Sequence, residues 1–122
     1  MYSEILYKCT NEEKSAVGPI MERAEDIFSC IKSKNDMNDK TDALSRYYFD
    51  KEMASEEHML GFITAKLEEQ TGMMWVAYYR KGFNSNGKIV TGSGSESEKV
   101  LARWKLKQIN DSWIVIDVNE AP

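Results

Sequence analysis

Histidine and cysteine are scarce in this chain of 122 residues, which holds one histidine, His58, and two cysteines, Cys9 and Cys30. Metal sites in proteins draw on clusters of such side chains at short spacings, and no such cluster occurs here. We therefore expect neither a metal nor a cofactor. The cysteines are expected to be free thiols, Cys30 buried on a helix and Cys9 near the chain start. A disulfide between them is the alternative and would indicate an oxidising compartment.

Long apolar runs are absent too. No segment approaches the ~20 apolar residues that a helix needs to cross a bilayer, and no basic start followed by an apolar stretch marks a signal peptide. Met1 followed by polar residues fits a natural start, or an expression start that replaces a removed signal. The protein is thus expected outside the cytoplasm if a signal was removed, and in the cytoplasm otherwise.

Sequence motifs of common enzyme classes are missing as well. The chain has no Gly-x-Ser-x-Gly motif, no phosphate-binding loop and no dinucleotide fingerprint. The Gly-Ser-Gly-Ser stretch at residues 92–95 lacks the lysine and the following helix of a phosphate loop. We interpret it as a flexible turn, within a small, polar stretch over residues 92–98 that is expected to be a mobile loop or a bulged strand edge.

Charge of one sign is nowhere concentrated. The net charge is −4; residues 1–72 hold 15 acidic and 9 basic side chains, whereas residues 73–122 hold 5 acidic and 7 basic ones. Nucleic acid is bound by a concentrated basic surface, so we expect no nucleic-acid partner. The length suits a single domain with a sizeable core. We expect residues 1–122 to form it, with residues 1–10 as a flexible arm.

What the sequence does hold is a strong β-hairpin pattern near its C-terminal end. Apolar and basic residues alternate over residues 99–109, and residues 113–118 form a second run rich in isoleucine and valine. We predict a three-residue loop with a bulge at residues 110–112. This register creates three cross-strand pairs: Leu106 with Ile116, Trp104 with Val118, and Lys105 with Asp117 on the outer face.

Helical patterns lie in the first half. Thr10 and Glu13 form a capping-box pattern, and the Gly-Pro pair at residues 18–19 marks either a kink or a fresh helix start. Up to about Lys34, apolar residues then recur at helical spacing: Ile20, Ala24, Ile27, Phe28 and Ile31. A shorter helix is expected to follow, with Asp39 or Thr41 as its cap, and to run through Ala43, Leu44, Tyr47 and Tyr48.

Residues 55–70 fit a helix and a strand about equally well. Ser55 followed by two glutamates is typical of a helix start, whereas Ile63, Ala65 and Leu67 alternate as in a strand. We predict a short helical turn near residues 55–60 and a strand over residues 62–70.

Strand patterns dominate the stretch that follows. Residues 73–83 are rich in aromatic and β-branched side chains, and the Asn-Gly pair at residues 86–87 favours a hairpin turn into a strand over residues 88–91. The fold class is therefore predicted to be α+β, with N-terminal helices packed on a curved antiparallel sheet.

The order of these elements carries a resemblance to a known family. An amphipathic helix, a short helix ending in Tyr-Tyr-Phe, several strands and the closing pattern Trp-Lys-Leu-Lys…Asp-Ser-Trp-Ile-Val-Ile follow one another. This order resembles the nuclear-transport-factor-2-like, or cystatin-like, superfamily, in which a curved sheet wraps a long helix into a cone. The likeness covers most of the chain and is one of pattern, without a diagnostic motif. Because the superfamily holds isomerases, dehydratases, immunity and secretion components and small bacterial envelope domains, it implies a fold more than a function.

The resemblance also implies where a catalytic site would lie. Enzymes of this kind place a carboxylate inside the cone, often helped by Tyr or His, which makes Asp50 and His58 the candidates. Each has a plainer interpretation: Asp50 as an exposed loop residue, and His58 as a surface residue near a helix start. Asp117 is expected to pair with Lys105 rather than to act as a base. We therefore assign no catalytic residue.

Aromatic residues are plentiful and provide the binding candidates. We expect most of the rings to fill the core; the alternative is a pocket in which tyrosine hydroxyls orient a small apolar ligand. The pocket candidates are Tyr47, Trp75, Tyr78 and Trp104. On the outer face, Trp113 and Val115 beside Ile109 would form an exposed apolar patch, which would bind a second copy of the chain or another protein.

Three functions stay open at this point. The favoured one is a non-enzymatic binding module, an accessory or envelope protein of a bacterium, that works through its sheet face or cone mouth. The second is an isomerase- or dehydratase-like enzyme that uses a pocket in the cone. The third is an immunity protein whose acidic helical half binds a basic toxin. We favour the first because the fold pattern comes without a catalytic constellation.

Overall fold

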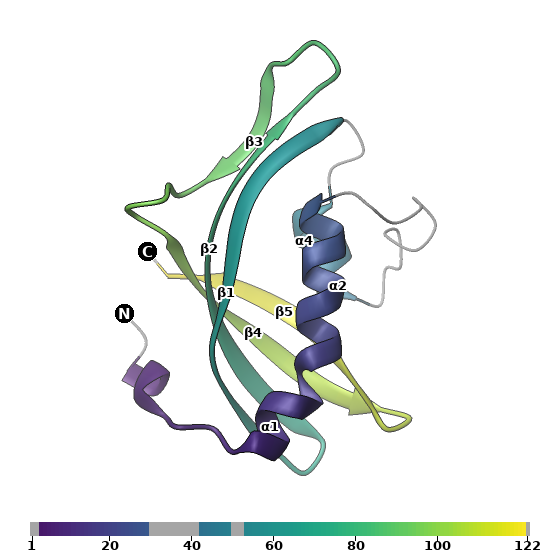
Figure 1. Cartoon of the computed structure of the whole chain (residues 1–122). Helices are drawn as coiled ribbons and strands as arrows, with labels where there is room; N and C mark the ends of the chain where they lie inside the picture. The colour runs from purple at the N-terminus through teal and green to yellow at the C-terminus, as the bar shows by residue number, and fades with distance from the viewer. Residues whose placement is uncertain (1–2, 30–41, 50–52, 122) are drawn as a thin grey trace.

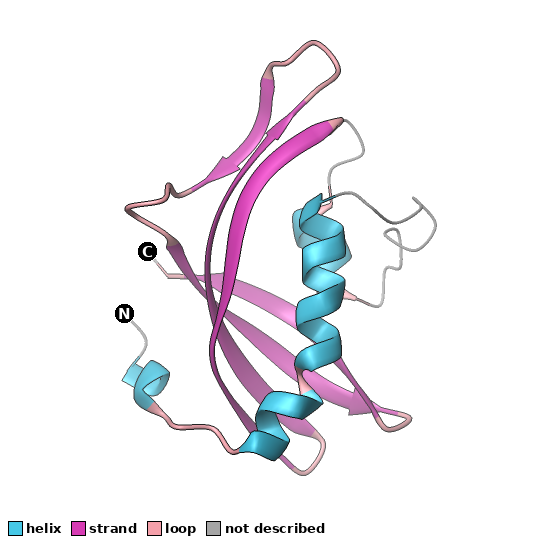
Figure 2. Ribbon diagram, in the orientation of Figure 1, coloured by secondary structure: helices cyan, strands magenta, loops and turns pink. Residues whose placement is uncertain are grey.

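The computed structural model of this protein describes residues 3–29, 42–49 and 53–121. The chain forms an α+β fold in which short helices precede a five-stranded antiparallel sheet. The helices of residues 18–29 and 43–48 lie along one face of the sheet, and the sheet bends around them without closing on itself (Figure 1, Figure 2). The predicted fold class is therefore confirmed.

The helical segments are short. They are the 3-10 helix η1 (Ser3–Leu6) and the α-helices α1 (Asn11–Ala16), α2 (Gly18–Ser29) and α4 (Ala43–Tyr48). The predicted capping box starts α1: the Thr10 side chain accepts a hydrogen bond from the Glu13 amide at 3.0 Å, and the Glu13 carboxylate accepts one from the Thr10 amide at 2.9 Å. The helix starts afresh at Gly18, because Pro19 fits a first turn, where its missing N–H costs no helical hydrogen bond.

The apolar stripe of α2 faces the sheet. Four predicted core positions are buried and share one side of the helix: Ile20, Ala24, Ile27 and Phe28. Ile31 and the predicted helix end near Lys34 lie outside the described residues.

The N-cap of α4 is Asp42, whose carboxylate accepts a hydrogen bond from the Leu44 amide at 2.9 Å. The prediction of Asp39 or Thr41 as the cap was wrong, and both of these residues lie outside the described part of the chain. Asp42 also forms an ion pair with Arg23 of α2. The cap therefore joins the two helices as well as starting one of them.

Five strands form the sheet: β1 (Ser55–Glu68), β2 (Thr71–Phe83), β3 (Ile89–Ser93), β4 (Val100–Ile109) and β5 (Ser112–Glu120). Their order is β1-β2-β4-β5, and β3 also pairs with β2. On the edge opposite β1, the strand β2 has two partners, since residues 71–78 pair with β4 and residues 80–83 pair with β3. The hairpin of β2 and β3 projects beyond the start of β4 (Figure 1).

The strand β1 replaces the helical turn predicted at residues 55–60. It begins at Ser55 and pairs with β2 along its whole length, with a bulge between Phe62 and Thr64. Over residues 55–60 exposed and half-buried side chains alternate, so the segment has one wet and one covered face. The helical prediction was wrong because pairing with a long neighbouring strand outweighs the local helical preference of the glutamates at positions 56 and 57.

The C-terminal hairpin turns in two residues rather than in three. Asn110 and Asp111 have φ angles of 52° and 67°, the left-handed conformation that a tight hairpin turn requires. Two of the predicted cross-strand pairs are confirmed: Trp104 with Val118, and Lys105 with Asp117.

The third predicted pair, Leu106 with Ile116, is wrong. Leu106 pairs with Val115, and the register shift next to Lys105 leaves Ile116 as the extra residue of a bulge. The bulge thus lies inside the strand and not in the loop. This exchanges the faces expected for residues 113–115, because side chains alternate along a strand.

The core lies between the helices and the sheet. Its large, fully buried side chains come from α2, α4, β2 and β4: Phe28, Leu44, Met74, Tyr78, Trp104 and Leu106. Polar atoms inside the core bond to one another. The Tyr48 hydroxyl accepts a hydrogen bond from Trp104 Nε1 at 3.1 Å and lies 2.6 Å from the Tyr78 hydroxyl, so these buried rings meet their hydrogen-bonding needs within the core.

Candidate functional site

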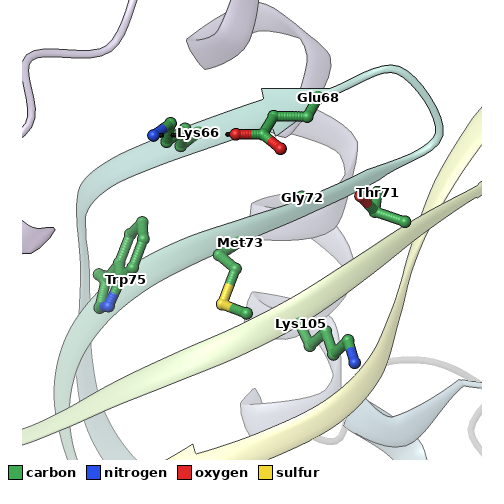
Figure 3. A pocket seen from close by; sticks show the side chains of 7 residues that line it. All are labelled: Lys66, Glu68, Thr71, Gly72, Met73, Trp75 and Lys105. Carbon is green, nitrogen blue, oxygen red and sulfur yellow. Dashed lines mark ion pairs between the residues drawn. The ribbon is translucent and has the colours of Figure 1, made fainter.

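The outer face of the sheet, which points away from α2, carries an open groove of about 390 Å³. Met74 and Val76 of β2 belong to the core cluster, so Met73 and Trp75 between them point to the opposite side. The volume falls within the range of small-molecule sites, roughly 300–1,000 Å³. Seven residues of β1, β2 and β4 line this outer groove (Figure 3): Lys66, Glu68, Thr71, Gly72, Met73, Trp75 and Lys105.

Three neighbouring strands supply one cross-strand row of the outer groove. Met73 pairs with Lys66 of β1 on one side and with Lys105 of β4 on the other. Adjacent strands lie about 4.8 Å apart, so the backbones of the two lysines are about 10 Å apart. Two ammonium groups thus flank an apolar centre formed by Met73 and Trp75 (Figure 3).

Trp75 differs from the core tryptophan Trp104 in its position and in its hydrogen bonding. Its side chain is only 3% exposed, yet it lies outside the core cluster, on the outer face. Its indole Nε1 is buried and has no hydrogen-bond acceptor among the described residues. In contrast, Trp104 donates its indole proton to Tyr48. A buried N–H without a partner costs about 1–3 kcal/mol, so the position of Trp75 is not explained by hydrogen bonding within the described residues.

Of the three charged side chains that line the outer groove, two form an ion pair with each other, and the third, Lys105, forms none among the described residues. Lys66 Nζ lies 3.8 Å from Glu68 Oε1, and both side chains are more than half exposed, so this ion pair contributes little stability. Lys105 stands opposite Asp117 in the register, but no ion pair joins them in the part of the chain that the structure describes. The N-terminal arm borders the groove, because the ring centre of Tyr7 lies 5.8 Å from Lys66 Nζ.

A second polar cluster lies on the helical face of the sheet, around His58. The ring Nδ1 lies 2.5 Å from Glu56 Oε1 of the same strand, and Nε2 lies 2.6 Å from Glu25 Oε2 of α2. The His58 side chain is only 13% exposed, and its ring packs edge-on against Phe28 at 5.6 Å. The prediction of His58 as a surface residue at a helix start was therefore wrong, because its strand turns the ring towards the helices.

The protonation of this cluster follows from its contacts. Burial opposes the positive charge of His58, but the hydrogen bonds to Glu25 and Glu56 outweigh it and raise the pKa of the imidazole. Burial also raises the pKa of the Glu56 carboxyl, which the hydrogen bond to His58 partly offsets. The buried guanidinium of Arg80, the cross-strand partner of His58, donates a hydrogen bond to the Tyr48 carbonyl at 2.8 Å.

This arrangement limits what His58 can do chemically. Both ring nitrogens are engaged by carboxylates, so neither is presented to a substrate as a general base. The contacts instead connect α2 to β1 across the edge of the core. No group of three or more Cys, His, Asp or Glu side chains has metal-binding geometry in the residues described.

The structure separates the four aromatic binding candidates. Tyr78 and Trp104 are completely buried in the core, whereas Tyr47 is 52% exposed. A hydrogen bond from the Tyr47 hydroxyl to the Glu120 carboxylate raises the pKa of Tyr47 to about 12. Trp75 alone among the four lines the outer groove. The sequence predicted Trp75 in a pocket of the cone, whereas the structure places it on the outer face, and the groove's lysines and Met73 were not among the candidates.

The apolar patch predicted from Trp113 and Val115 is not formed. Val115 is only 1% exposed, and Trp113 packs against the core, because the bulge in β5 turns both towards the helices. Of the other predicted residues, Cys9 is a free, partly exposed thiol, and Asp50 and Cys30 lie outside the described residues.

No protein-family description, curated protein or solved structure matches this chain. Among the described residues, no helix has both the length and the apolar character needed to cross a bilayer.

Proposed function

We propose that this protein is a non-enzymatic binding module that takes a small, largely apolar ligand in the outer groove, over Met73 and Trp75. The observation that supports it most directly is Trp75, a buried tryptophan outside the core whose indole N–H has no acceptor among the described residues. Because the Nε1 atom is itself buried, the ligand contact is assigned to the Trp75 ring and to Met73 beside it, for which a ligand in the groove supplies an apolar partner.

The catalytic alternative has less support. The histidine that would act as the acid or base bonds to two carboxylates at once, and Tyr78 and Trp104 serve as core residues. We also propose that the chain belongs to the nuclear-transport-factor-2-like superfamily, which the packing of N-terminal helices on a bent antiparallel sheet supports.

The binding proposal is tested with a neutral fluorescent probe, N-phenyl-1-naphthylamine, which becomes bright in apolar sites. We expect saturable binding to the intact protein, and we expect Met73→Ser to weaken it about fivefold, since removing an apolar contact of about 1 kcal/mol has that effect. Met59→Ser is the matched control, because Met59 is a half-exposed methionine on the same face but outside the groove.

Two results would overturn the proposal: no saturable probe binding, or equal weakening by the two serine variants. The urea midpoint of each variant is measured alongside, so that a loss of binding is not confused with unfolding.

A further inference from the structure

We infer that the outer groove binds a small organic anion, a carboxylate or sulfonate that carries an apolar body. This inference rests on the proposed binding function and adds the chemical class of the ligand to it. Its basis is the set of charged and donor groups around the groove, together with the apolar floor between them.

The strand β4 presents a basic row beside the groove. Its core-facing residues are Ala102, Trp104 and Leu106, all completely buried. Side chains alternate along a strand, so the outward positions are Arg103, Lys105 and Lys107. Of these, Lys105 lines the groove itself, and Arg103 stands opposite Trp75 in the register. Basic side chains thus outnumber acidic ones beside the groove, where Glu68 and Asp117 are the acidic neighbours, although the whole chain carries a net charge of −4.

The groups that can bond a ligand here are mainly donors. Lys105 has an ammonium group without an ion pair in the described part of the chain, and Lys66 has only the long contact to Glu68. The one carboxylate in the lining, Glu68, already faces Lys66 at 3.8 Å. A ligand that supplies acceptors and negative charge satisfies these groups, whereas a cation would leave them unpaired and meet repulsion.

The floor of the groove requires an apolar part of the ligand. Met73 and Trp75 form the centre of the lining, and the two lysines stand at its sides (Figure 3). A bare inorganic anion would contact a lysine but leave this floor in water. An amphipathic anion covers the floor with its apolar body and places its charged end near Lys105 or Lys66. The apolar contact and the attraction to the lysine then both contribute to its affinity.

The test compares two fluorescent probes that differ by one charged group. 1-Anilinonaphthalene-8-sulfonate is N-phenyl-1-naphthylamine with a sulfonate added. We expect Lys105→Gln and Lys66→Gln each to weaken binding of the sulfonate probe about threefold, as for exposed ion pairs, and to leave binding of the neutral probe unchanged. Lys81→Gln is the control, since Lys81 is an exposed lysine of β2 outside the groove.

Two further measurements locate the site and extend the result to carboxylates. The indole N–H resonance of Trp75, assigned with Trp75→Phe, is expected to shift when the sulfonate probe binds. Octanoate is expected to displace that probe, whereas octylammonium at the same concentration is not.

The outcomes separate the two proposals. If the neutral probe binds in a way that depends on Met73 but the lysine variants leave the sulfonate probe unaffected, the anion inference fails and the binding module stands. Displacement by octylammonium as effective as that by octanoate also overturns the anion inference. If neither probe binds, both proposals fail.

Discussion

Tyr48 holds the central position among the polar groups of the core. Its hydroxyl accepts the indole proton of Trp104 and lies within hydrogen-bond distance of the Tyr78 hydroxyl. Burial raises the pKa of both tyrosines far above the neutral range, because a phenolate would be poorly solvated there. The three side chains therefore act as a neutral, hydrogen-bonded part of the core and not as an acid or base.

We expect Tyr48→Phe to lower the free energy of unfolding by about 2 kcal/mol, since it leaves the buried Trp104 N–H without its acceptor and the buried Tyr78 hydroxyl without its partner. Tyr47→Phe is the matched control, because the neighbouring Tyr47 is half exposed and bonds Glu120 at the surface. Its effect is expected to stay within about 0.5 kcal/mol. Urea unfolding followed by circular dichroism measures both; equal losses would contradict the role given to Tyr48.

At the residue scale, the sequence could name aromatic side chains but not their surroundings. Tyr78, Trp104 and Trp75 were all pocket candidates, because a core and an apolar pocket use the same residue types. Which of the three lines a groove depends on the face of the sheet that each occupies. That face is set by contacts with the helices, which are distant in sequence.

At the scale of elements, Glu13 joins three segments of the chain. Its carboxylate accepts hydrogen bonds from the Thr10 amide, from the Tyr7 hydroxyl at 2.8 Å and from the Leu67 amide of β1 at 2.8 Å. Burial opposes the charge, but these bonds outweigh it and lower the pKa of Glu13. One side chain thus fixes the N-terminal arm and α1 to the end of a strand.

Replacing Glu13 by alanine is expected to lower the free energy of unfolding by about 1.5 kcal/mol, through loss of the cap and of the bond to the strand. Glu12→Ala is the control, because Glu12 is an exposed neighbour in the same helical turn. Hydrogen exchange of the Leu67 amide is expected to speed up in Glu13→Ala but not in Glu12→Ala. Unchanged exchange at Leu67 in the Glu13 variant would refute this link.

Elements with strong local signals could be predicted, and the others could not. The capping box at Thr10 and the apolar spacing of α2 depend on residues within two turns of one another, so sequence sufficed. The first half of β1 was mistaken for a helical turn, because its partner strand decides its conformation. The bulge at Ile116 was missed for a similar reason: packing under the helices, and not the turn residues alone, fixes the register.

The outer groove illustrates the same limit. Lysines that alternate with apolar residues are typical of any wet strand face, so Lys66 and Lys105 carried no signal of their own. They come together only because β1 and β4 both pair with β2 at Met73. The pairing of β2 with β4, which is not its neighbour in sequence, could not be derived from local patterns.

At the scale of the whole molecule, the helical layer is fixed to the sheet by charge as well as by apolar packing. Glu25 of α2, Glu56 of β1 and Arg80 of β2 surround His58, and two of them bond its ring directly. A histidine whose pKa is raised on folding stabilises the fold below its unfolded pKa of about 6.5. That contribution is lost as the pH rises through the higher pKa of the folded state.

We therefore expect the wild-type protein to lose stability, as the pH rises above about 6.5, more steeply than His58→Gln, which has no titrating imidazole. Urea unfolding at several pH values gives the difference in the free energy of unfolding between the two proteins, and this difference is expected to shrink as the pH rises. The raised pKa of Glu56 contributes a loss of stability in the same direction. A difference that stays constant, or grows, with pH would refute the role of His58.

The bond from the Leu67 amide to Glu13 has a consequence for aggregation. β1 is an outer strand of the described sheet, and exposed strand edges attract strands of other molecules into fibrils. An incoming strand needs free amide donors at regular intervals, but here one donor is occupied by Glu13 and the bulge next to Thr64 interrupts the spacing. This end of the strand is thereby closed to intermolecular strand addition, and one carboxylate of α1 serves as part of the barrier.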